Sequence, residues 1–416
     1  MKSAESAAIG ERVRKIVRSE FREESAAGPF PSKPVWAEMR KCGSELWLDS
    51  GDIEDVRGRW TREFTALTTN NTLVNKVVQT GIFDALVPDA AAKLRAAVPD
   101  ISDEALVREI GFMLNCRTAL RLIEAFGVHV SVELHPAMAH DIEASVHYGK
   151  RYFSICPELF YVKVPLTPEG YCAVARLGAA GVPVNFTLGF SARQNYLAAL
   201  FSQPSFVNVF LGRNNAVVSD NKLGDGKYVG EKACLATQRA LIEIRKAHPE
   251  IKTRLIAASL RNGGQMRDLA GVDLYTAPPK AAQEFVALEM APESLASQVN
   301  RHYPIELSEG LTEGNTGLDA LWEVTPDFMA FAEACCALGR TTATGDQLVR
   351  AANEAGLSFL RRFAVGEADT IKADGKIPVL GKWSDVALDD LMTQSALQSF
   401  AVDQQALDDR IRSLAG

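Results

Sequence analysis

The sequence lacks the features that mark membrane, secreted and nucleic-acid-binding proteins. No apolar run approaches the roughly 18 residues that a membrane-spanning helix needs. The first residues are charged and lack the apolar core of a signal peptide, so we expect no secretory leader. The seven cysteines form no CxxC pair, which favours a reducing cytoplasm over a disulfide framework. A net charge of -7 predicts neither nucleic acid nor an anionic membrane as a partner.

The remaining composition is that of an ordinary globular protein. Hydrophobic residues make up 47% of the 416 residues and charged residues 23%. This length allows one large domain with an accessory region, or two to three small domains.

Short apolar runs separated by helical segments fill the middle of the chain. There are eight such runs: Glu45–Asp49, Phe64–Asn70, Val128–Leu134, Phe160–Val164, Val182–Leu188, Ser205–Phe210, Thr253–Ser259 and Val272–Thr276. Eight strands alternating with helices over about 250 residues are typical of an α/β TIM barrel, (β/α)₈. An open doubly wound sheet is the alternative, but the turn after the first run lacks the glycine-rich pattern of that fold. Helix-start signals at Thr167-Pro168 and at Ser191 support the alternation.

The two ends of the chain are predicted to be helical. Residues 1–25 carry apolar side chains at helical spacing, and a Pro- and Gly-rich stretch follows. Residues 286–416 show no convincing strand and three helical patterns, at 326–338, 345–359 and 387–414, with a Gly/Lys/Asp-rich loop expected at 365–380. We therefore expect an N-terminal helical segment and linker (1–43), a catalytic barrel (44–285) and a helical extension (286–416). The extension would pack on the barrel or on a second copy, giving a monomer or a homodimer.

A lysine in an apolar strand is the strongest chemical signal. Lys163 lies between Val162 and Val164, and burying its charge costs several kcal/mol unless the amine is paired or deprotonated. An amine that gives up its proton is a nucleophile suited to Schiff-base chemistry on a carbonyl. A solvated or salt-bridged lysine is the plainer alternative.

Polar side chains recur with the same parity at the ends of several predicted strands. Alternation places both members of an i, i+2 pair on one face, and the carboxyl ends of barrel strands build the active site. The residues expected at one mouth are Asp49, Asn70, Glu133, Lys163, Asn185, Thr187, Ser259 and Arg261. Each alone could be a cap, a salt-bridge partner or a satisfied core residue. Five strands with the same pattern favour a shared site.

Two further patterns are weaker. His135, His140 and His147 do not match the common zinc spacings, so we expect no metal site and a position on a helix surface. The turn Arg261-Asn262-Gly263-Gly264 could hold an anion through its arginine and backbone N–H groups.

Taken together and in order, the motifs resemble those of the transaldolase family across about residues 45–285. The matching segments are Leu48-Asp49-Ser50-Gly51-Asp52, Leu67-Thr68-Thr69-Asn70, Val130-Ser131-Val132-Glu133, Val162–Gly170, Val184–Ser191 with Gln194, Phe210-Leu211-Gly212-Arg213 and Ala257–Asn262. Singly they are modest, but seven in order is a specific pattern.

The resemblance implies a class I mechanism without cofactor or metal, in which a protonated imine accepts the electrons. Lys163 would form the Schiff base, and Asp49 would take the C4 hydroxyl proton. Glu133 would handle the other proton transfers through a water held with Thr187. The residues implied in substrate binding are Thr68, Asn70 and Asn185 for the triose, and Phe210, Arg213, Ser259 and Arg261 at the phosphate end. The implied reaction moves dihydroxyacetone from sedoheptulose 7-phosphate or fructose 6-phosphate to glyceraldehyde 3-phosphate or erythrose 4-phosphate, in the pentose phosphate pathway.

The chain departs from the family pattern at Asn71, where proline is usual, and at Asn208, where serine is usual. These departures keep open a related enzyme of a specialised pathway. A fructose-6-phosphate aldolase is a further alternative, although Glu133 and Phe210 stand where those aldolases carry glutamine and tyrosine. A barrel-fold regulatory protein without catalysis is the non-enzyme alternative, and the retained Lys163 argues against it.

Overall fold

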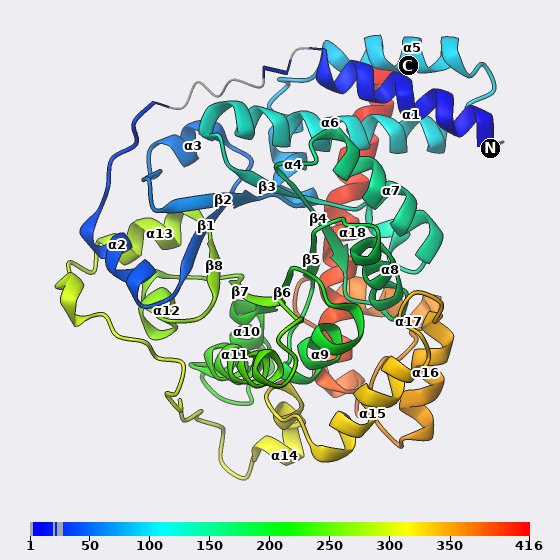
Figure 1. The fold of residues 1–416 in the computed structure, drawn as a ribbon. Helices are drawn as coiled ribbons and strands as arrows, with labels where there is room; N and C mark the ends of the chain where they lie inside the picture. The colour runs from blue at the N-terminus through cyan, green and yellow to red at the C-terminus, as the bar shows by residue number, and fades with distance from the viewer. Residues whose placement is uncertain (1–2, 20, 23–27) are drawn as a thin grey trace.

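Eight parallel strands close into a barrel in chain order, which confirms the predicted TIM barrel. The computed structural model describes residues 3–19, 21–22 and 28–416 (Figure 1). The strands are β1 (Glu45–Asp49), β2 (Phe64–Thr68), β3 (His129–Glu133), β4 (Phe160–Pro165), β5 (Val184–Thr187), β6 (Phe206–Phe210), β7 (Arg254–Ala258) and β8 (Leu274–Ala277). Every strand overlaps one of the eight apolar runs, so the runs were sufficient to predict the sheet.

Helices surround the barrel, with several inserted between consecutive strands (Figure 1). They are α3 (Ile53–Arg57), α4 (Asn71–Gln79), α5 (Leu86–Ala97), α6 (Asp103–Phe126), α7 (Ile142–Ile155), α8 (Pro168–Ala179), α9 (Ala192–Leu197), α10 (Leu211–Asp220), α11 (Val229–Ala247), α12 (Gly263–Asp268) and α13 (Pro279–Val286). The predicted caps are confirmed. Thr167 accepts a hydrogen bond from the Gly170 N–H, and Ser191 forms a capping box with Gln194. The helix after Ser191, α9, ends at Leu197 and continues as a π-helical turn, Ala198–Ser202.

Aromatic side chains fill the barrel interior at the level where its strands begin. The Trp47 and Tyr161 rings stack with centroids 5.5 Å apart, and Phe206 meets the Trp47 ring edge-on at 4.8 Å. All three alternate along their strands with residues that point outward. This packing fills one end of the barrel and leaves the carboxyl ends of the strands to form the mouth.

The N-terminal helix α1 (Ser3–Arg18) lies against α5, α6 and α7. Its apolar positions Ile9, Val13 and Val17 are buried, as the helical spacing predicted. Phe21 follows the helix rather than extending it, and part of the predicted segment, including residues 23–25, lies outside the described residues. The short helix α2 (Pro34–Lys41) then leads into β1.

Helices also make up the C-terminal region. They are α14 (Glu313–Thr316), α15 (Pro326–Ala337), α16 (Gly345–Glu354), α17 (Val365–Asp374) and α18 (Leu388–Ala415). The loop predicted at 365–380 is wrong in its first half, because α17 forms there. Only Ile371 of α17 is buried, so the sequence carries almost no apolar periodicity, and the helix is instead capped by Glu367 accepting from the Ala364 N–H.

The last helix, α18 (red in Figure 1), runs beside the barrel and contacts α4, α5, α6 and α17. Its Thr393 hydroxyl donates to the carbonyl of Leu188, the residue that follows β5. This contact places the helix at the mouth of the barrel. Among the described residues, no helix is long and apolar enough to cross a membrane.

Candidate active site

A cavity of about 1030 Å³ lies at the carboxyl ends of the strands. Ten of the eleven site residues predicted from the sequence line it: Asp49, Thr68, Asn70, Lys163, Asn185, Thr187, Phe210, Arg213, Ser259 and Arg261. The eleventh, Glu133, lies beside Lys163 on the neighbouring strand. The fold therefore gathers these side chains at one place, as expected for residues at the ends of barrel strands.

Lys163 is buried in the wall of this cavity, with a relative exposure of 5%. Its Nζ donates a hydrogen bond to the Thr69 carbonyl at 3.0 Å and lies 3.9 Å from Glu133 Oε2. Val162 and Val164 point the other way into the helical layer and are fully buried. Packing on both sides thus holds the amine where a ligand in the cavity can reach it.

Glu133 is a buried carboxylate with unused hydrogen-bonding capacity. Within the part of the chain that the structure describes, neither of its carboxylate oxygens nor Thr187 Oγ1 has a hydrogen-bond partner. Burial raises the pKa of Glu133 to about 6, against the opposing effect of the Lys163 charge. Buried polar atoms of this kind are normally satisfied by ordered water or ligand. A carboxylate with a pKa near neutrality suits proton transfer in either direction.

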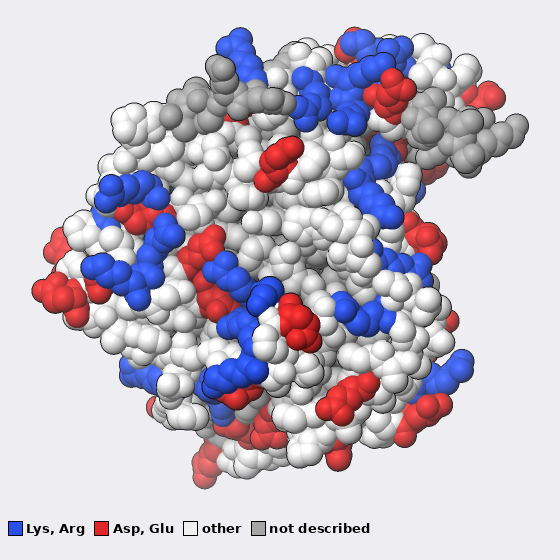
Figure 2. Space-filling view, in the orientation of Figure 1, with Lys and Arg blue, Asp and Glu red and all other residues white. Residues whose placement is uncertain are grey.

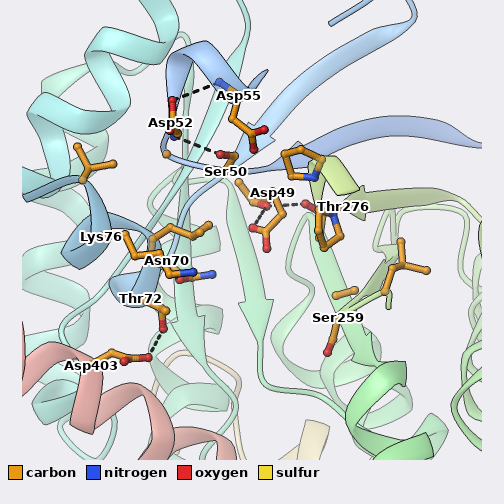
Figure 3. A pocket seen from close by; sticks show the side chains of 18 of the residues that line it. Asp49, Ser50, Asp52, Asp55, Asn70, Thr72, Lys76, Ser259, Thr276 and Asp403 are labelled. Atoms are coloured by element: carbon orange, nitrogen blue, oxygen red, sulfur yellow. Dashed lines mark hydrogen bonds between the residues drawn. The ribbon is translucent and has the colours of Figure 1, made fainter. Parts of the chain in front are cut away.

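Asp49 ends β1 and is held by two threonines from neighbouring strands (Figure 3). Thr68 Oγ1 donates to Asp49 Oδ1 at 2.6 Å, and the Thr276 hydroxyl bonds Thr68 Oγ1 in turn. Because Thr68 gives its only proton to Asp49, Thr276 must be the donor in the second bond. Burial raises the pKa of Asp49, while Lys163 and Thr68 oppose that rise. Thr276 ends the eighth predicted run, yet the sequence analysis did not assign it to the site.

Two asparagines present amide groups to the cavity. Asn70 accepts from the Leu73 N–H through Oδ1 as the cap of α4, which leaves its amide N–H groups for other partners. Figure 3 shows Asn70 on one side of Asp49 and Ser259 on the other. Asn185 pairs in register with Lys163 on the adjacent strand and bonds both Ser131 and Asn208.

Arg213 and Arg261 concentrate positive charge at one end of the cavity. Burial and the neighbouring Arg261 lower the pKa of Arg213 to about 10, and burial lowers the pKa of Arg261. Neither makes an ion pair with a carboxylate of the described residues. A Cβ at Gly212 would lie 2.2 Å from the Ser259 carbonyl and 2.7 Å from Arg261 Nε, so the glycine lets the two loops approach. Ser259 adopts a left-handed backbone at φ 62° to make this turn. The arrangement suits a bound anion.

The C-terminal region supplies cavity residues that the sequence did not predict. Ser399 and Phe400 of α18 lie beside Arg213, whose Nη1 also donates to the Lys376 carbonyl at 3.1 Å. Asp403 of the same helix bonds the Thr72 hydroxyl on α4 (Figure 3). These contacts join residues more than 160 positions apart, and no local sequence pattern signals them.

The structure gives no support for a metal centre among the histidines. No group of three or more His, Cys, Asp or Glu side chains within the described ranges is placed to hold a metal ion. His135 faces Asp408, and His140 faces Glu169. Figure 2 shows acidic and basic side chains interspersed over the face drawn.

The sequence profile of the transaldolase/fructose-6-phosphate aldolase family matches residues 46–322, more than half of the chain. The chain belongs to this family. A probable transaldolase from Thermus thermophilus is 34% identical over 238 residues, which is 56% of this chain and 86% of that protein. A transaldolase from Shewanella amazonensis is 26% identical over 261 residues, covering 60% and 78%. One from Methylococcus capsulatus is 25% identical over 288 residues, covering 66% and 84%.

The family match ends before the last helices of the chain. Strands β1–β8 and every site residue predicted from the sequence lie within it or directly at its edge, whereas α15–α18 lie beyond it. In this member of the transaldolase/fructose-6-phosphate aldolase family, the segment outside the match thus contributes Ser399, Phe400 and Asp403 to the cavity.

Proposed function

We propose that this chain is a transaldolase that transfers a dihydroxyacetone unit through a Schiff base on Lys163. The donor would be sedoheptulose 7-phosphate or fructose 6-phosphate, and the acceptor glyceraldehyde 3-phosphate or erythrose 4-phosphate. The observation that carries the proposal is the buried Lys163 amine in a cavity that also holds Asp49, with Glu133 3.9 Å away. A lysine nucleophile flanked by two carboxyl groups has the groups needed for imine formation and proton transfer.

In the proposed mechanism, the Lys163 amine attacks the keto carbon, and the carbonyl oxygen leaves as water once it has been protonated. Glu133 delivers and later recovers that proton through a water held with Thr187, since all three of their side-chain oxygens lack other partners among the described residues. Asp49 removes the C4 hydroxyl proton as the C3–C4 bond breaks. The bond's electrons move into the imine to give an enamine, and the aldose phosphate departs. The acceptor aldehyde then adds by the reverse steps.

The binding roles follow from position in the cavity. Asn70 and Asn185 would hydrogen-bond the triose that stays on Lys163, keeping the enamine oriented for the incoming aldehyde. Arg213, Arg261 and Ser259 would bind the phosphate at the positive end, and Phe210 would contribute an apolar part of the cavity wall. The pentose phosphate pathway supplies and consumes such sugars, and we propose it as the setting.

A fructose-6-phosphate aldolase is the second candidate, because the matching family includes both activities. The two differ in what happens to the enamine. An aldolase protonates it and releases free dihydroxyacetone, whereas a transaldolase keeps it until an acceptor arrives.

Borohydride trapping tests the proposal directly. Incubation with fructose 6-phosphate, reduction and peptide mass mapping should find a triose adduct on Lys163. Erythrose 4-phosphate added before reduction should deplete the adduct. Lys163→Ala should give none, whereas Lys280→Ala, which removes a lysine from the cavity rim, should react like the parent. The absence of an adduct on the folded protein with either ketose would overturn the proposal. Release of free dihydroxyacetone without an acceptor would favour the aldolase.

A further inference from the structure

Asn208 occupies the middle of β6 and faces the barrel interior. Its neighbours two positions away, Phe206 and Phe210, share that face, and Asn208 itself is only 2% exposed while lining the cavity. On one side it pairs in register with Ile256 of β7, and on the other its side chain reaches Asn185 of β5. A buried amide at this position must have its hydrogen-bonding groups satisfied.

A directed chain of hydrogen bonds runs through Asn208. The Gly189 backbone N–H donates to Asn208 Oδ1 at 3.3 Å, and Asn208 Nδ2 donates to Asn185 Oδ1 at 3.1 Å. Asn185 Nδ2 then donates to Ser131 Oγ at 3.2 Å. The chain links the loop after β5 to β6, back to β5 and on to β3.

The first link fixes the direction of all the others. Side-chain amides are nearly symmetric in shape and can turn over, but a backbone N–H can only donate. Gly189 therefore requires the oxygen of Asn208 on its side, which turns the nitrogen of Asn208 toward Asn185. Asn185 must then offer its oxygen to Asn208 and its nitrogen to Ser131. Gly189 has to be glycine, because a Cβ there would lie 2.3 Å from the Asn208 carbonyl.

We propose that Asn208 is a positioning residue that fixes which end of the Asn185 amide faces the substrate. This inference rests on the proposed function, in which Asn185 binds the triose on Lys163. Asn185 stands level with Lys163 in the sheet, and its carbonyl oxygen is occupied by Asn208. What remains for a ligand is an amide N–H, a donor that matches the oxygen lone pairs of a hydroxylated, carbonyl-derived fragment. Without Asn208, the Asn185 amide could turn over and present an acceptor instead.

A double-mutant cycle measures whether Asn208 acts through Asn185. We expect Asn208→Ala to lower kcat/KM for fructose 6-phosphate by about 10- to 100-fold. At about 1.4 kcal/mol per factor of ten, this loss corresponds to about 1.4–2.8 kcal/mol of transition-state stabilisation. Added to Asn185→Ala, the same change should have almost no further effect. Independent, multiplying effects, or an unchanged kcat/KM in Asn208→Ala, would overturn the proposal.

Asn195→Ala is the matched control. Asn195 is fully buried on α9, and its Nδ2 donates to the Asn208 backbone carbonyl at 3.1 Å. Its loss removes a buried amide bond to the same residue without removing any side chain that lines the cavity. We expect a lower Tm with kcat/KM close to that of the parent, and effects that multiply with those of Asn185→Ala.

A measurement without substrate separates this inference from the proposed function. In protein labelled with ¹⁵N-asparagine, the signal lost in Asn185→Ala identifies the Asn185 side-chain amide. Its hydrogen exchange should be slow in the parent and in Asn195→Ala but faster in Asn208→Ala. Equal exchange rates would overturn the positioning role, whereas a failed borohydride trap with intact protection would overturn only the proposed reaction.

Discussion

Lys163 Nζ lies 3.9 Å from Glu133 Oε2, close enough for charge attraction but too far for a direct hydrogen bond. The amine instead donates to the Thr69 carbonyl. Glu133 therefore interacts with Lys163 through charge alone, and its oxygens remain available for proton transfer. In the proposed mechanism, the nucleophile Lys163 and the acid–base group Glu133 thus have no direct hydrogen bond to break before each acts.

Glu133→Gln should remove the fall in activity at low pH and should stabilise the fold. The pKa of about 6 predicts that the acid limb of the rate profile falls near that pH, and the variant should be about 10²- to 10⁴-fold slower without that limb. Because the folded pKa is raised above the unfolded value of 4.5, the native state holds the extra proton between these values. Stability from this group therefore falls as pH rises from about 4.5 to 6.

The gain in Glu133→Gln at pH 7 should approach about 2 kcal/mol, since one pKa unit corresponds to 1.36 kcal/mol. Urea unfolding at pH 4 and pH 7 checks this, and the difference between parent and variant should shrink at the lower pH. A variant that is less stable at pH 7 would contradict the environment described for Glu133.

Thr276→Val should lower the fraction of Asp49, the proposed base, that is ionised at a given pH, without removing the carboxylate. The substitution keeps the shape of the side chain but removes the hydroxyl that donates to Thr68. The Thr68–Asp49 bond is then less well supported, so the Asp49 pKa should rise further. Activity on the acid side should therefore begin to fall at a higher pH, with kcat reduced about tenfold. Thr65→Val is the control, since Thr65 lies near the start of β2, the strand that carries Thr68, and donates to Glu45 instead. Identical pH profiles in the parent and in Thr276→Val would exclude an effect of Thr276 on Asp49 through Thr68.

The barrel and most of its site could be predicted from the sequence because both follow local rules. Strand alternation placed Lys163, Asn185 and Thr187 on one face, and parallel strands brought their ends together. Caps such as Thr167 are formed by residues three apart and are equally local. These features need no knowledge of which distant segments meet.

The parts that escaped prediction depend on distant contacts or on weak patterns. Helix α17 buries a single apolar residue, Ile371, and so looks like a loop in the sequence. Ser399 and Asp403 lie on a helix with no readable motif and reach the cavity only because α18 packs at the barrel mouth. Asn208 was noticed as a departure, but its bond to Asn185 depends on β6 lying beside β5.

Arg213→Ala should affect phosphorylated substrates selectively. The buried Arg213 lies near a second cation, Arg261, and a bound phosphate would relieve their repulsion. We expect KM for phosphorylated acceptors to rise about 100-fold, given about 1.5–3 kcal/mol for a charge-assisted hydrogen bond, with little change for unphosphorylated glyceraldehyde. Millimolar inorganic phosphate should raise the Tm of the parent and of Arg267→Ala, a control on α12 whose arginine pairs with Asp268, but not that of Arg213→Ala. An equal rise in all three would place the anion elsewhere.

The start of α18 is attached to the barrel by a buried ion pair whose loss should be costly. Asp389 is 0% exposed and accepts from Arg193 Nε at 2.8 Å, Arg193 Nη2 at 2.7 Å and the Ser191 hydroxyl at 2.7 Å. Asp389→Ala leaves a buried arginine without its partner, so we expect a loss of about 3–5 kcal/mol in urea unfolding. It should also raise KM, because α18 carries Ser399 and Phe400 to the cavity.

Replacing both partners of this pair separates the cost of an unpaired charge from the value of the pair. Arg193→Met combined with Asp389→Leu removes both charges and keeps apolar bulk, so it should recover most of the stability that Asp389→Ala loses. Glu54→Ala, which breaks an exposed pair with Arg57, should change stability by less than about 1 kcal/mol. The contrary result is a double variant as unstable as Asp389→Ala. That result would mean that, in the parent, α18 is held by the hydrogen bonds that Asp389 accepts from Ser191 and from the helix start, and that the ion pair contributes little.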